Sequence, residues 1–392
     1  MVQKLTAIDL FSGAGGFSLA AYNADVDVLG AIEFDQNAAE TYKKNLVGRL
    51  GTKTHVYAED ITEFNIDSLI NDIGIKKGTL DILLGGPPCQ GFSSHRINDS
   101  GKDDPRNALL IRYFDFVEHL KPKAFLVENV PGLLWPRHEK YLNDFLALSK
   151  EHGYQIITGE PLILNARDYG VPQNRRRAFI FGLRDDVMQE NIVWPPLPTH
   201  NKTGNSKWLT ASSAFEKPAD VVLDDFKKRL EEKFEHSKEE SAKIIESLKW
   251  GEKLEPQDSC NLNMTHSETL IKVFENTPLL GGRDESGREL NCHKNYKGHK
   301  DVYGRIYPHI QANTITAGCN NPSKGRFVHP WLNHGITLRH AARLQTFPDD
   351  YMFTGGSMSV AKQIGNAVPV RLGEALISTI KIILEQKSKL SQ

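Results

Sequence analysis

The segment GGPPCQGFS, residues 85–93, places a cysteine where it could act as a nucleophile. It follows an apolar run that predicts a strand, and the carboxyl ends of strands are where α/β sheets bind ligands. Pro87 and Pro88 fix their own φ angles, so they predict a stiff loop around Cys89. A lone cysteine is more often a buried structural residue, but two prolines and flanking glycines are typical of a rigid mount for a reactive thiolate.

A carboxylate ends the next apolar run. Glu128 lies in the segment AFLVENV, residues 124–130. If this run is a neighbouring strand, Glu128 lies at the same edge of the sheet as Cys89, at a position from which water is largely excluded. Loss of water favours the protonated carboxyl group, which could donate or share a proton near neutral pH. A helix-capping or turn carboxylate is the alternative interpretation.

Three adjacent arginines stand before a further apolar run. They lie in PQNRRR, residues 172–177, which is followed by AFIFGL. Because side chains alternate along a strand, Arg175 and Arg177 are expected to share one face and Arg176 to lie on the other. Guanidinium groups suit phosphate or a base carbonyl, although a run of like charges is commonly a solvated surface cluster.

A glycine-rich turn and two acidic residues predict a nucleoside-binding pocket. The turn DLFSGAGGF, residues 9–17, follows the first predicted strand, and its glycines allow close approach of the backbone to a ligand. Glu33 ends the second predicted strand, in a position to accept hydrogen bonds from a ribose, and Asp60 closes the third. The spacing suits NAD nearly as well, although Ser18 stands where the dinucleotide pattern has its last glycine. A glycine-rich turn without a ligand is the remaining alternative.

The composition is that of a soluble globular protein with two or three domains. The chain has 392 residues, of which 39% are hydrophobic and 25% charged, and its net charge is −1. No stretch approaches the roughly 18 apolar residues of a membrane span, and the N-terminus shows no secretion signal, so neither a membrane nor a secreted protein is expected. Four cysteines are too few for a disulfide scaffold and suit a reducing compartment. With so little net charge, binding to nucleic acid must depend on local basic patches.

The elements that would position these residues alternate along the first 185 residues. Short apolar runs predict strands at 5–11, 26–32, 55–57, 80–84, 124–127, 155–164 and 178–183, with helical patterns at 36–50 and 105–120. Runs with little polar alternation, separated by helices, predict an α/β fold with a mostly parallel, doubly wound sheet. Prolines at 194–198 suggest a domain boundary, followed by a charged, solvated helix within 217–253, irregular loops with short strands at 261–330, and helices at 337–346 and 370–384.

Together these segments resemble the DNA cytosine-5 methyltransferase family. DLFSGAGGFS, GGPPCQGFS, ENV, QNRRR, RLQTFPDDY (343–351) and QIGNAVP (363–369) occur in that family's order and with the spacing of its bacterial members. They span residues 9–369, and PPCQ followed by ENV and Q-x-R-x-R is highly specific. The resemblance implies a Rossmann-like fold that depends on S-adenosylmethionine. Its catalytic domain would cover 1–186 and resume at 331–392, around a smaller, irregular, β-rich target-recognition domain at 187–330.

The resemblance also implies covalent catalysis. Cys89 would add to C6 of cytosine, Glu128 would hydrogen-bond and protonate N3, and Arg177 would contact O2, with Arg175 near the neighbouring phosphate. The activated C5 would take the methyl group of S-adenosylmethionine, and elimination would free Cys89 and leave S-adenosylhomocysteine. Because C5 lies inside the stack of a duplex, the target base must be flipped out.

Eight residues of this chain match the family's cofactor pocket. They are Phe11, Gly13 and Gly15 in the turn, Glu33 on the ribose, Phe34 against the adenine, Asp60 at the adenine amino group, and Pro88 and Asn366, which would close the pocket. The last helix, within 369–387, is expected to pack against the N-terminal half of the sheet, which would bring Asn366 beside the first glycine turn.

Duplex DNA is the expected partner. Residues 291–330 carry a net charge of +5, from Lys294, Lys297, Lys300, Arg305, Lys324 and Arg326 against Asp301, which suits a phosphate backbone. The block TITAG (314–318) followed by NPSKGRF resembles the end of the family's variable recognition region. The residues expected to contact DNA are Ser93, Arg176, Lys324 and Arg326.

Three other functions fit parts of the pattern. An RNA (tRNA) cytosine-5 methyltransferase shares most motifs, but such relatives have a shorter recognition segment and usually differ after the catalytic cysteine, where this chain has CQGFS. A catalytically silent DNA-binding regulator would lose the PPC or ENV residues. An NAD-dependent oxidoreductase would have no role for PPCQ, ENV or QNRRR.

A zinc site is a further possibility, built from Cys260, Cys292 and Cys319 with His266 or His293. These residues lack the usual ligand spacings, so no metal is expected.

The chain shows no long N-terminal regulatory extension of the kind found in large chromatin-associated relatives. It is therefore expected to be a bacterial modification enzyme, acting as a monomer in the cytoplasm. Its functional partner would be a cognate restriction endonuclease.

Overall fold

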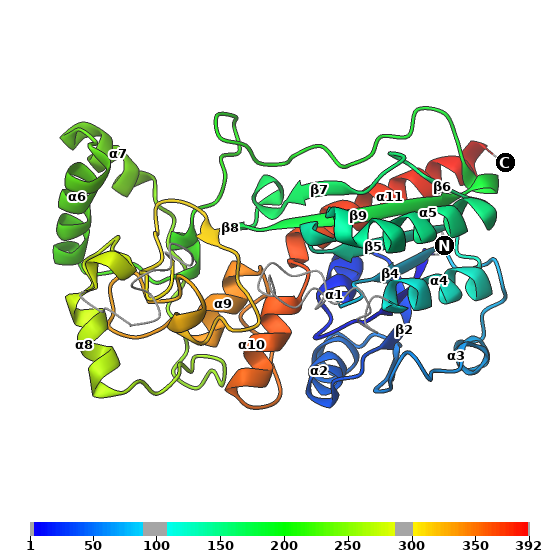
Figure 1. Ribbon diagram of the computed structural model, residues 1–392, viewed down its shortest axis with the longest axis horizontal. Helices are drawn as coiled ribbons and strands as arrows, with labels where there is room; N and C mark the ends of the chain where they lie inside the picture. Colours follow the sequence, from blue (N-terminus) through cyan, green and yellow to red (C-terminus); the bar gives the residue numbers. More distant parts are fainter. Residues whose placement is uncertain (1–3, 89–107, 287–300, 391–392) are drawn as a thin grey trace. The chain divides into compact units, whose positions relative to one another are not determined.

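The structure is a computed structural model, and it describes residues 4–88, 108–286 and 301–390 of the chain. The chain divides into two compact units. Unit 1 comprises Met1–Tyr169, Arg176–Thr199 and Ala367–Gln392, and unit 2 comprises Gly170–Arg175 and His200–Asn366. Figure 1 shows the elements of both units in the colours of the sequence.

Unit 1 is built on an eight-stranded sheet with the order β3-β2-β1-β4-β5-β9-β6, in which β7 also pairs with β9. Strands β3, β2, β1, β4 and β5 run parallel to one another, whereas β9 is antiparallel to β5, β6 and β7. The strands are β1 (Thr6–Leu10), β2 (Asp27–Ile32), β3 (His55–Tyr57), β4 (Ile82–Gly85), β5 (Ala124–Asn129), β6 (Tyr154–Ile156), β7 (Leu162–Asn165) and β9 (Arg176–Arg184). This arrangement confirms the predicted α/β fold with a mostly parallel sheet.

Helices cover this sheet. Strands β4 and β5 are buried along their whole length, which is why apolar residues run through them without polar alternation. One continuous core joins the sheet to helices α3, α4 and α5, and includes Leu69, Phe116 and Phe145. The helices of unit 1 are α1 (Gly16–Asn23), α2 (Gln36–Tyr42), α3 (Ile66–Ile73), α4 (Ala108–Leu120), α5 (Glu139–Glu151) and α11 (Val370–Leu390), with a π-helical turn η1 (Lys43–Arg49) and 3₁₀ helices η3 (Pro131–Leu134), η4 (Pro136–His138), η5 (Ala166–Tyr169) and η6 (Asp185–Val187).

The last helix packs against the first. In Figure 1, α11 and α1 lie at opposite ends of the colour scale, yet they are neighbours in unit 1. Gly373 makes this packing close, because a Cβ atom at that position would stand 2.8 Å from Ala20 Cβ. The final residues of the chain therefore complete the layer that its first helix begins.

Unit 2 is mainly helical and irregular in the part that the structure describes. Its helices are α6 (Asp220–Phe234), α7 (Lys238–Ser247), α8 (Glu268–Asn276), α9 (Leu338–Leu344) and α10 (Ser357–Asn366), and its 3₁₀ helices are η7 (Ala211–Ala214), η8 (Arg283–Glu285) and η10 (Pro322–Lys324). The named strands of this unit, β8 (Gln173–Asn174) and β10 (Ala312–Asn313), have two residues each and pair in parallel. The expectation of a β-rich second region is therefore wrong for the described residues.

The charged segment of unit 2 forms two helices rather than the single helix expected. Glu235 adopts a left-handed φ of 55°, which ends α6. Ser237 then begins α7 with a capping box, in which its hydroxyl accepts from the Glu240 amide and the Glu240 carboxylate accepts from the Ser237 amide.

The borders between the units differ from the predicted domain borders. The chain leaves unit 1 at Thr199, just after the proline-rich segment, rather than at residue 186. It returns at Ala367 rather than at residue 331, because α9 packs on η7 within unit 2. The assignment of catalysis and target recognition to separate regions remains a prediction.

Candidate functional site

The predicted site residues of unit 1 gather at the carboxyl ends of neighbouring parallel strands. The glycine turn follows β1, Glu33 follows β2, the prolines of the GGPP segment follow β4, and Glu128 lies near the end of β5. This edge is the usual ligand-binding edge of a parallel α/β sheet. Cys89 and Ser93 lie outside the described residues.

The glycine turn is tied to the end of β2 through Glu33. Gly13 and Gly15 adopt left-handed φ angles of 56° and 89°, which glycine reaches without strain. The Gly13 amide donates to Glu33 Oε2 at 2.9 Å, and the Asp35 amide donates to Glu33 Oε1 at 2.8 Å. A carboxylate offers about four acceptor positions, so Glu33 can still accept from the hydroxyl groups of a ribose.

Two side chains that follow β2 and β3 expose the surfaces that an adenosyl group would need. Phe34 is 70% exposed, although large apolar side chains are usually buried. Asp60 is also exposed, and hydrogen bonds from the Thr62 amide and hydroxyl lower the pKa of its carboxyl group. Phe11 packs partly against the core, and Pro88 is exposed after β4. The chemistry of these residues fits an adenosyl group.

Glu128 and Arg177 form an ion pair on adjacent antiparallel strands. Arg177 Nε lies 2.9 Å from Glu128 Oε1, and the two side chains are only 13% and 10% exposed. The carboxylate is thus buried beside a fixed positive charge, which compensates its loss of water. The pair presents an acceptor and a donor side by side, as recognition of a cytosine edge requires.

Glu128 also lies against the loop that leads to Cys89. A Cβ atom at Gly86 would stand 3.4 Å from Glu128 Oε2. The neighbouring Asn129 donates from Nδ2 to Pro87 O at 3.4 Å. The ENV and GGPP segments therefore form one corner of unit 1.

The three arginines of QNRRR have three different environments. Arg177 pairs with Glu128, and Arg176 is exposed at the start of β9. Arg175 precedes the strand, is only 1% exposed, and belongs to unit 2, where it donates to Ile315 O at 2.9 Å and Gly365 O at 3.0 Å. These contacts do not support the predicted phosphate contact of Arg175, because its guanidinium faces backbone carbonyls.

Sequence reasoning missed Asp9, a buried carboxyl group in β1. It is 1% exposed, and its Oδ2 accepts from Ser18 Oγ at 2.6 Å while Oδ1 has no hydrogen-bond partner. Burial raises the pKa of Asp9 to about 7, the nearby Glu33 charge adds to this, and the Ser18 hydrogen bond opposes it. The signal in the sequence is an acidic residue within a strand that is otherwise apolar.

The C-terminal segment reaches the glycine turn directly after Asn366. A Cβ atom at Gly16 would stand 2.7 Å from Val368 O and 3.4 Å from Ala367 Cβ. Asn366 itself is exposed at the end of α10 and is grouped with unit 2. Its place in the cofactor pocket remains a prediction.

The predicted basic patch divides into exposed and internal residues. Lys324 is exposed, whereas Arg305 is only 3% exposed and donates to backbone carbonyls. Arg326 is also mostly covered: it donates to Gly281 O and Arg305 O at 3.0 Å each and pairs with Asp301. Neither buried guanidinium is placed for phosphate, which argues against the predicted DNA contact of Arg326. Lys294, Lys297 and Lys300 lie outside the described residues.

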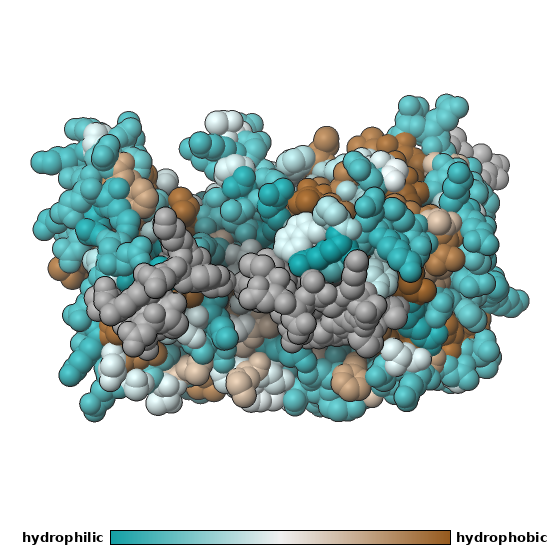
Figure 2. Space-filling model, viewed as in Figure 1, coloured by the Kyte–Doolittle hydropathy of each residue, from teal (hydrophilic) through white to brown (hydrophobic). Residues whose placement is uncertain are grey.

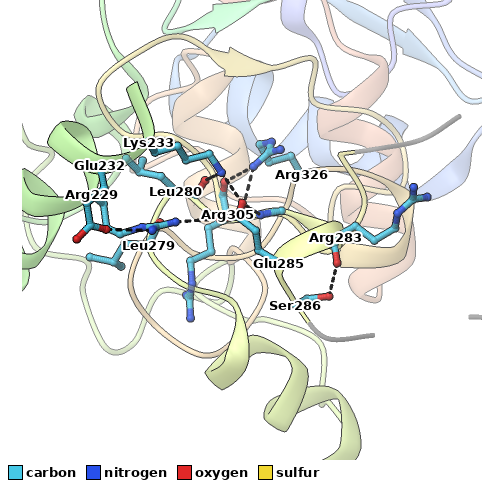
Figure 3. Close-up of polar contacts among 12 residues, drawn as sticks. Arg229, Glu232, Lys233, Leu279, Leu280, Arg283, Glu285, Ser286, Arg305 and Arg326 are labelled. Atoms are coloured by element: carbon cyan, nitrogen blue, oxygen red, sulfur yellow. Dashed lines mark hydrogen bonds and ion pairs between the residues drawn. The ribbon is translucent and has the colours of Figure 1, made fainter. Parts of the chain in front are cut away.

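Figure 3 shows how the backbone segment before those lysines is held. Glu285 accepts from Arg229 at 2.8 Å and from Lys233, both on α6. The same two side chains donate to Leu279 O and Leu280 O. The charged helix α6, which was expected to be purely solvated, therefore holds the 279–286 loop of unit 2.

A cluster of Glu216, His329 and His340 lies in unit 2, with one ligand-type atom of each within 4.8 Å of the others. His340 Nε2 lies 3.4 Å from Glu216 Oε2. The Nδ1 atom of His329 accepts from the backbone amide of Leu332, and that of His340 accepts from Thr337. Both Nε2 atoms must then carry the proton of a neutral ring, and metal-binding histidines show the opposite arrangement. These tautomers argue against a metal centre; within the cluster His340 contacts Glu216, while His329 Nε2 has no hydrogen-bond partner among the described residues.

The cysteines and histidine considered for zinc have other surroundings where they are described. Cys260 and Cys319 are buried free thiols, and burial raises the pKa of Cys319 to about 12. His266 Nε2 accepts from the Gly335 amide at 3.0 Å. Cys292 and His293 lie outside the described residues.

The face of the molecule shown in Figure 2 is mostly hydrophilic. Its hydrophobic residues gather mainly over the upper right part of unit 1 in that view. Among the described helices, none combines the length and apolar character of a membrane span.

Comparison with known proteins gives concordant matches. The family model "C-5 cytosine-specific DNA methylase" matches residues 5–382. The chain is 30% identical to the Type II methyltransferase M.DdeI of Desulfomicrobium norvegicum, over 97% of this chain and 89% of that protein. It is 29% identical to the Type II methyltransferase M.AgeI of Thalassovita gelatinovora, over 97% of this chain and 100% of that protein.

The fold matches solved structures as well. A DNA modification methyltransferase encoded within an E. coli prophage aligns with a TM-score of 0.67 and 24% identity, over 97% of this chain and all of that one. The S. pombe Dnmt2 methyltransferase aligns with a TM-score of 0.54 and 15% identity, over 98% and 99% of the two chains. At these identities the likeness establishes the fold alone.

Proposed function

Because the chain belongs to the C-5 cytosine-specific DNA methylase family, we propose that it transfers a methyl group from S-adenosylmethionine to C5 of cytosine in a specific sequence of duplex DNA. One observation supports this most directly: the Glu128–Arg177 ion pair lies against the GGPP segment that leads to Cys89. Glu128, Arg177 and the GGPP segment that leads to Cys89 thus lie together at one edge of the sheet.

The residues of this edge supply the addition step that C5 chemistry needs. C5 of cytosine is a poor nucleophile until C6 is attacked, so the Cys89 thiolate forms a bond to C6 while Glu128 delivers a proton to N3. Arg177 donates to O2 of the base and holds Glu128 in place. After methylation the C5 proton leaves to a base, N3 gives up its proton, the Cys89–C6 bond breaks, and the thiolate is restored.

When bound, S-adenosylmethionine would supply the methyl group for C5. Glu33 would bind the ribose, the exposed ring of Phe34 would pack on the adenine, and Asp60 would accept from the adenine amino group. Gly13 and Gly15 would let the backbone approach the ligand, while Phe11, Pro88 and Asn366 would complete the pocket.

Access to C5 requires that the cytosine be flipped out of the duplex. The exposed cations Arg176 and Lys324 contact phosphates, and Ser93, which follows Cys89 in the sequence, contacts DNA. Arg175 and Arg326 are not included among the phosphate ligands, because their guanidinium groups donate to backbone carbonyls inside unit 2.

The setting that we propose is that of the named relatives, which are Type II methyltransferases. The protein acts as a monomer in the bacterial cytoplasm and protects DNA from a cognate restriction endonuclease. That endonuclease is a functional partner and need not bind it.

The test is bisulfite sequencing of DNA from cells that express the protein. We expect one methylated sequence context with the parent chain and none with Cys89→Ala. Cys260→Ala, which alters a buried cysteine of unit 2, is the matched control and should retain the parent pattern.

Two further assays define the substrate and the intermediate. Duplex DNA with 5-fluorocytosine at the target should trap a covalent complex, because fluorine at C5 blocks elimination. Methylation of tRNA without methylation of duplex DNA, or full activity of Cys89→Ala, would contradict the proposed function.

A further inference from the structure

Arg175 is among the largest fully buried side chains of the described residues. Its two terminal nitrogens donate in different directions: Nη1 binds Ile315 O at 2.9 Å, and Nη2 binds Gly365 O at 3.0 Å. Ile315 belongs to the TITAG loop (residues 314–318), and Gly365 lies in the last turn of α10. One guanidinium group thus joins two backbone segments of unit 2 that are far apart in the sequence.

These two segments touch through their backbones. A Cβ atom at Gly365 would stand 2.2 Å from Thr316 C and 2.3 Å from Ala317 N, which is closer than real Cβ atoms come. Only glycine therefore permits the approach of α10 to the TITAG loop. The position of the loop depends both on this contact and on the guanidinium that spans it.

Two glutamines complete the junction. Gln173 Oε1 accepts from the Ile315 amide at 2.8 Å, and its Nε2 donates to Leu344 O at 3.0 Å and to Gln345 Oε1 at 2.9 Å. Gln345 Nε2 in turn donates to Ile364 O at 2.7 Å. Irregular backbone that neither helix nor sheet satisfies is here satisfied by side chains.

We infer that Arg175 is a positioning residue, which fixes the TITAG loop against the end of α10 for DNA binding. The inference rests on the proposed function, in which Lys324 contacts a phosphate; this side chain lies beside Gly318 of the TITAG loop. Lysine cannot replace it, because a single ammonium group lacks the planar fork that reaches two carbonyls. An arginine that binds phosphate and one that positions a loop differ in a measurable way, since only the phosphate ligand displaces counterions from DNA.

The experiment measures the Kd of duplex DNA carrying the methylated context as a function of salt. For Arg175→Met we expect about tenfold weaker binding, because two buried carbonyls lose their donor, and a salt slope equal to that of the parent chain. Gly365→Ala should weaken binding similarly and also leave the slope unchanged, because it moves the loop without changing any charge. In methylation assays both variants should raise KM for DNA more than they lower kcat.

Two control variants show the results expected for a lost phosphate contact and for a neutral substitution. Arg176→Ala removes an exposed cation and should lower the salt slope by about one, as loss of a phosphate contact does. Gly356→Ala places a methyl group where nothing lies within 4 Å and should bind like the parent chain.

A salt slope that falls by about one for Arg175→Met would identify Arg175 as a phosphate ligand and overturn the inference. So would parent-like binding by Gly365→Ala, which decides the question even if Arg175→Met does not fold. If the parent chain fails to methylate duplex DNA, the proposed function fails instead, and the two failures are therefore distinct.

Discussion

One arginine of unit 1 and two buried arginines of unit 2 have different partners. In unit 1, Arg177 pairs with the Glu128 carboxylate near a sheet edge. In unit 2, Arg175 and Arg305 are at most 3% exposed and donate chiefly to backbone carbonyls. The carbonyls of unit 1 are largely satisfied by its sheet, whereas the loops of unit 2 need side-chain donors. The Arg177 guanidinium thus pairs with a carboxylate beside regular strands, whereas those of Arg175 and Arg305 satisfy the carbonyls of irregular segments.

Arg305 is the extreme case in unit 2. Its donors reach the carbonyls of Thr277, Phe274, His329 and Leu332 and the side chain of Asn333, at distances of 2.7–3.0 Å. Burial lowers the pKa of Arg305 to about 10, so the group is still charged at neutral pH. One side chain therefore holds α8 to the loop around residue 330.

The largest effect is expected from the unit 1 pair. Glu128→Gln should reduce kcat by about two to four orders of magnitude, because the amide cannot transfer a proton to N3. Its affinity for S-adenosylmethionine should stay close to that of the parent chain, whereas its free energy of unfolding should fall, because the buried Arg177 guanidinium loses its charged partner. Steady-state methylation and isothermal titration with the cofactor check this, and a variant as fast as the parent would remove Glu128 from its role.

The next effect concerns the unit 2 arginines and is an effect on stability. Arg305→Met should lower the free energy of unfolding by about 3–5 kcal/mol, because several buried acceptors lose their donor at once. Lys272→Met, which changes an exposed cation of α8, is the control and should shift it by less than about 0.5 kcal/mol. Chemical denaturation measures the free energy of unfolding of both variants. Similar values for the two would show that the buried carbonyls around Arg305 do not depend on its guanidinium group.

The last effect is on the pH dependence of stability and concerns Asp9, the buried acid of unit 1. Because its pKa rises from 3.8 to about 7 on folding, the unfolded chain ionises first and the folded state loses stability as pH rises between these values. The loss is about 1.4 kcal/mol per pH unit at most. Asp9→Asn removes this titration, so its stability relative to the parent should increase from pH 4 to pH 7.

Thermal unfolding at a series of pH values measures this difference. The groups that act on Asp9 are the Glu33 charge and the Ser18 hydroxyl, and the buried phenols Tyr42 and Tyr113 lie close enough to feel its charge. Glu59→Gln, which neutralises an exposed carboxylate, is the control. A stability difference that stays constant with pH would show that Asp9 does not titrate in this range.

Much of unit 1 follows from apolar runs and turn residues. The third strand was predicted at its observed bounds, and the first, second and fifth within two residues, because buried parallel strands are apolar throughout. The segment expected as one strand at 155–164 instead divides into β6 and β7, since Gly159 adopts a left-handed φ of 73°. The local sequence pattern therefore predicts a strand correctly where one continuous apolar run forms one strand.

The internal arginines could not be predicted in this way. Alternation along a strand placed Arg175 on one face with Arg177, but β9 begins at Arg176, so the alternation does not extend to Arg175. Counting charges likewise added Arg305 and Arg326 to a basic patch, although both side chains donate to backbone carbonyls within unit 2. Burial of a charged residue depends on carbonyls contributed by distant segments, and a local pattern does not contain them.

The packing of α11 on α1 has a consequence for how the protein is made. The ribosome completes the strands of the sheet before it adds residues 200–366, and it makes α11 only after them. At roughly 5–20 residues per second, that intervening segment takes on the order of ten to thirty seconds. During this time the apolar surface of α1 around Phe17 and Ala20 is not covered by α11, so we expect the nascent chain to be prone to aggregation until α11 has been made.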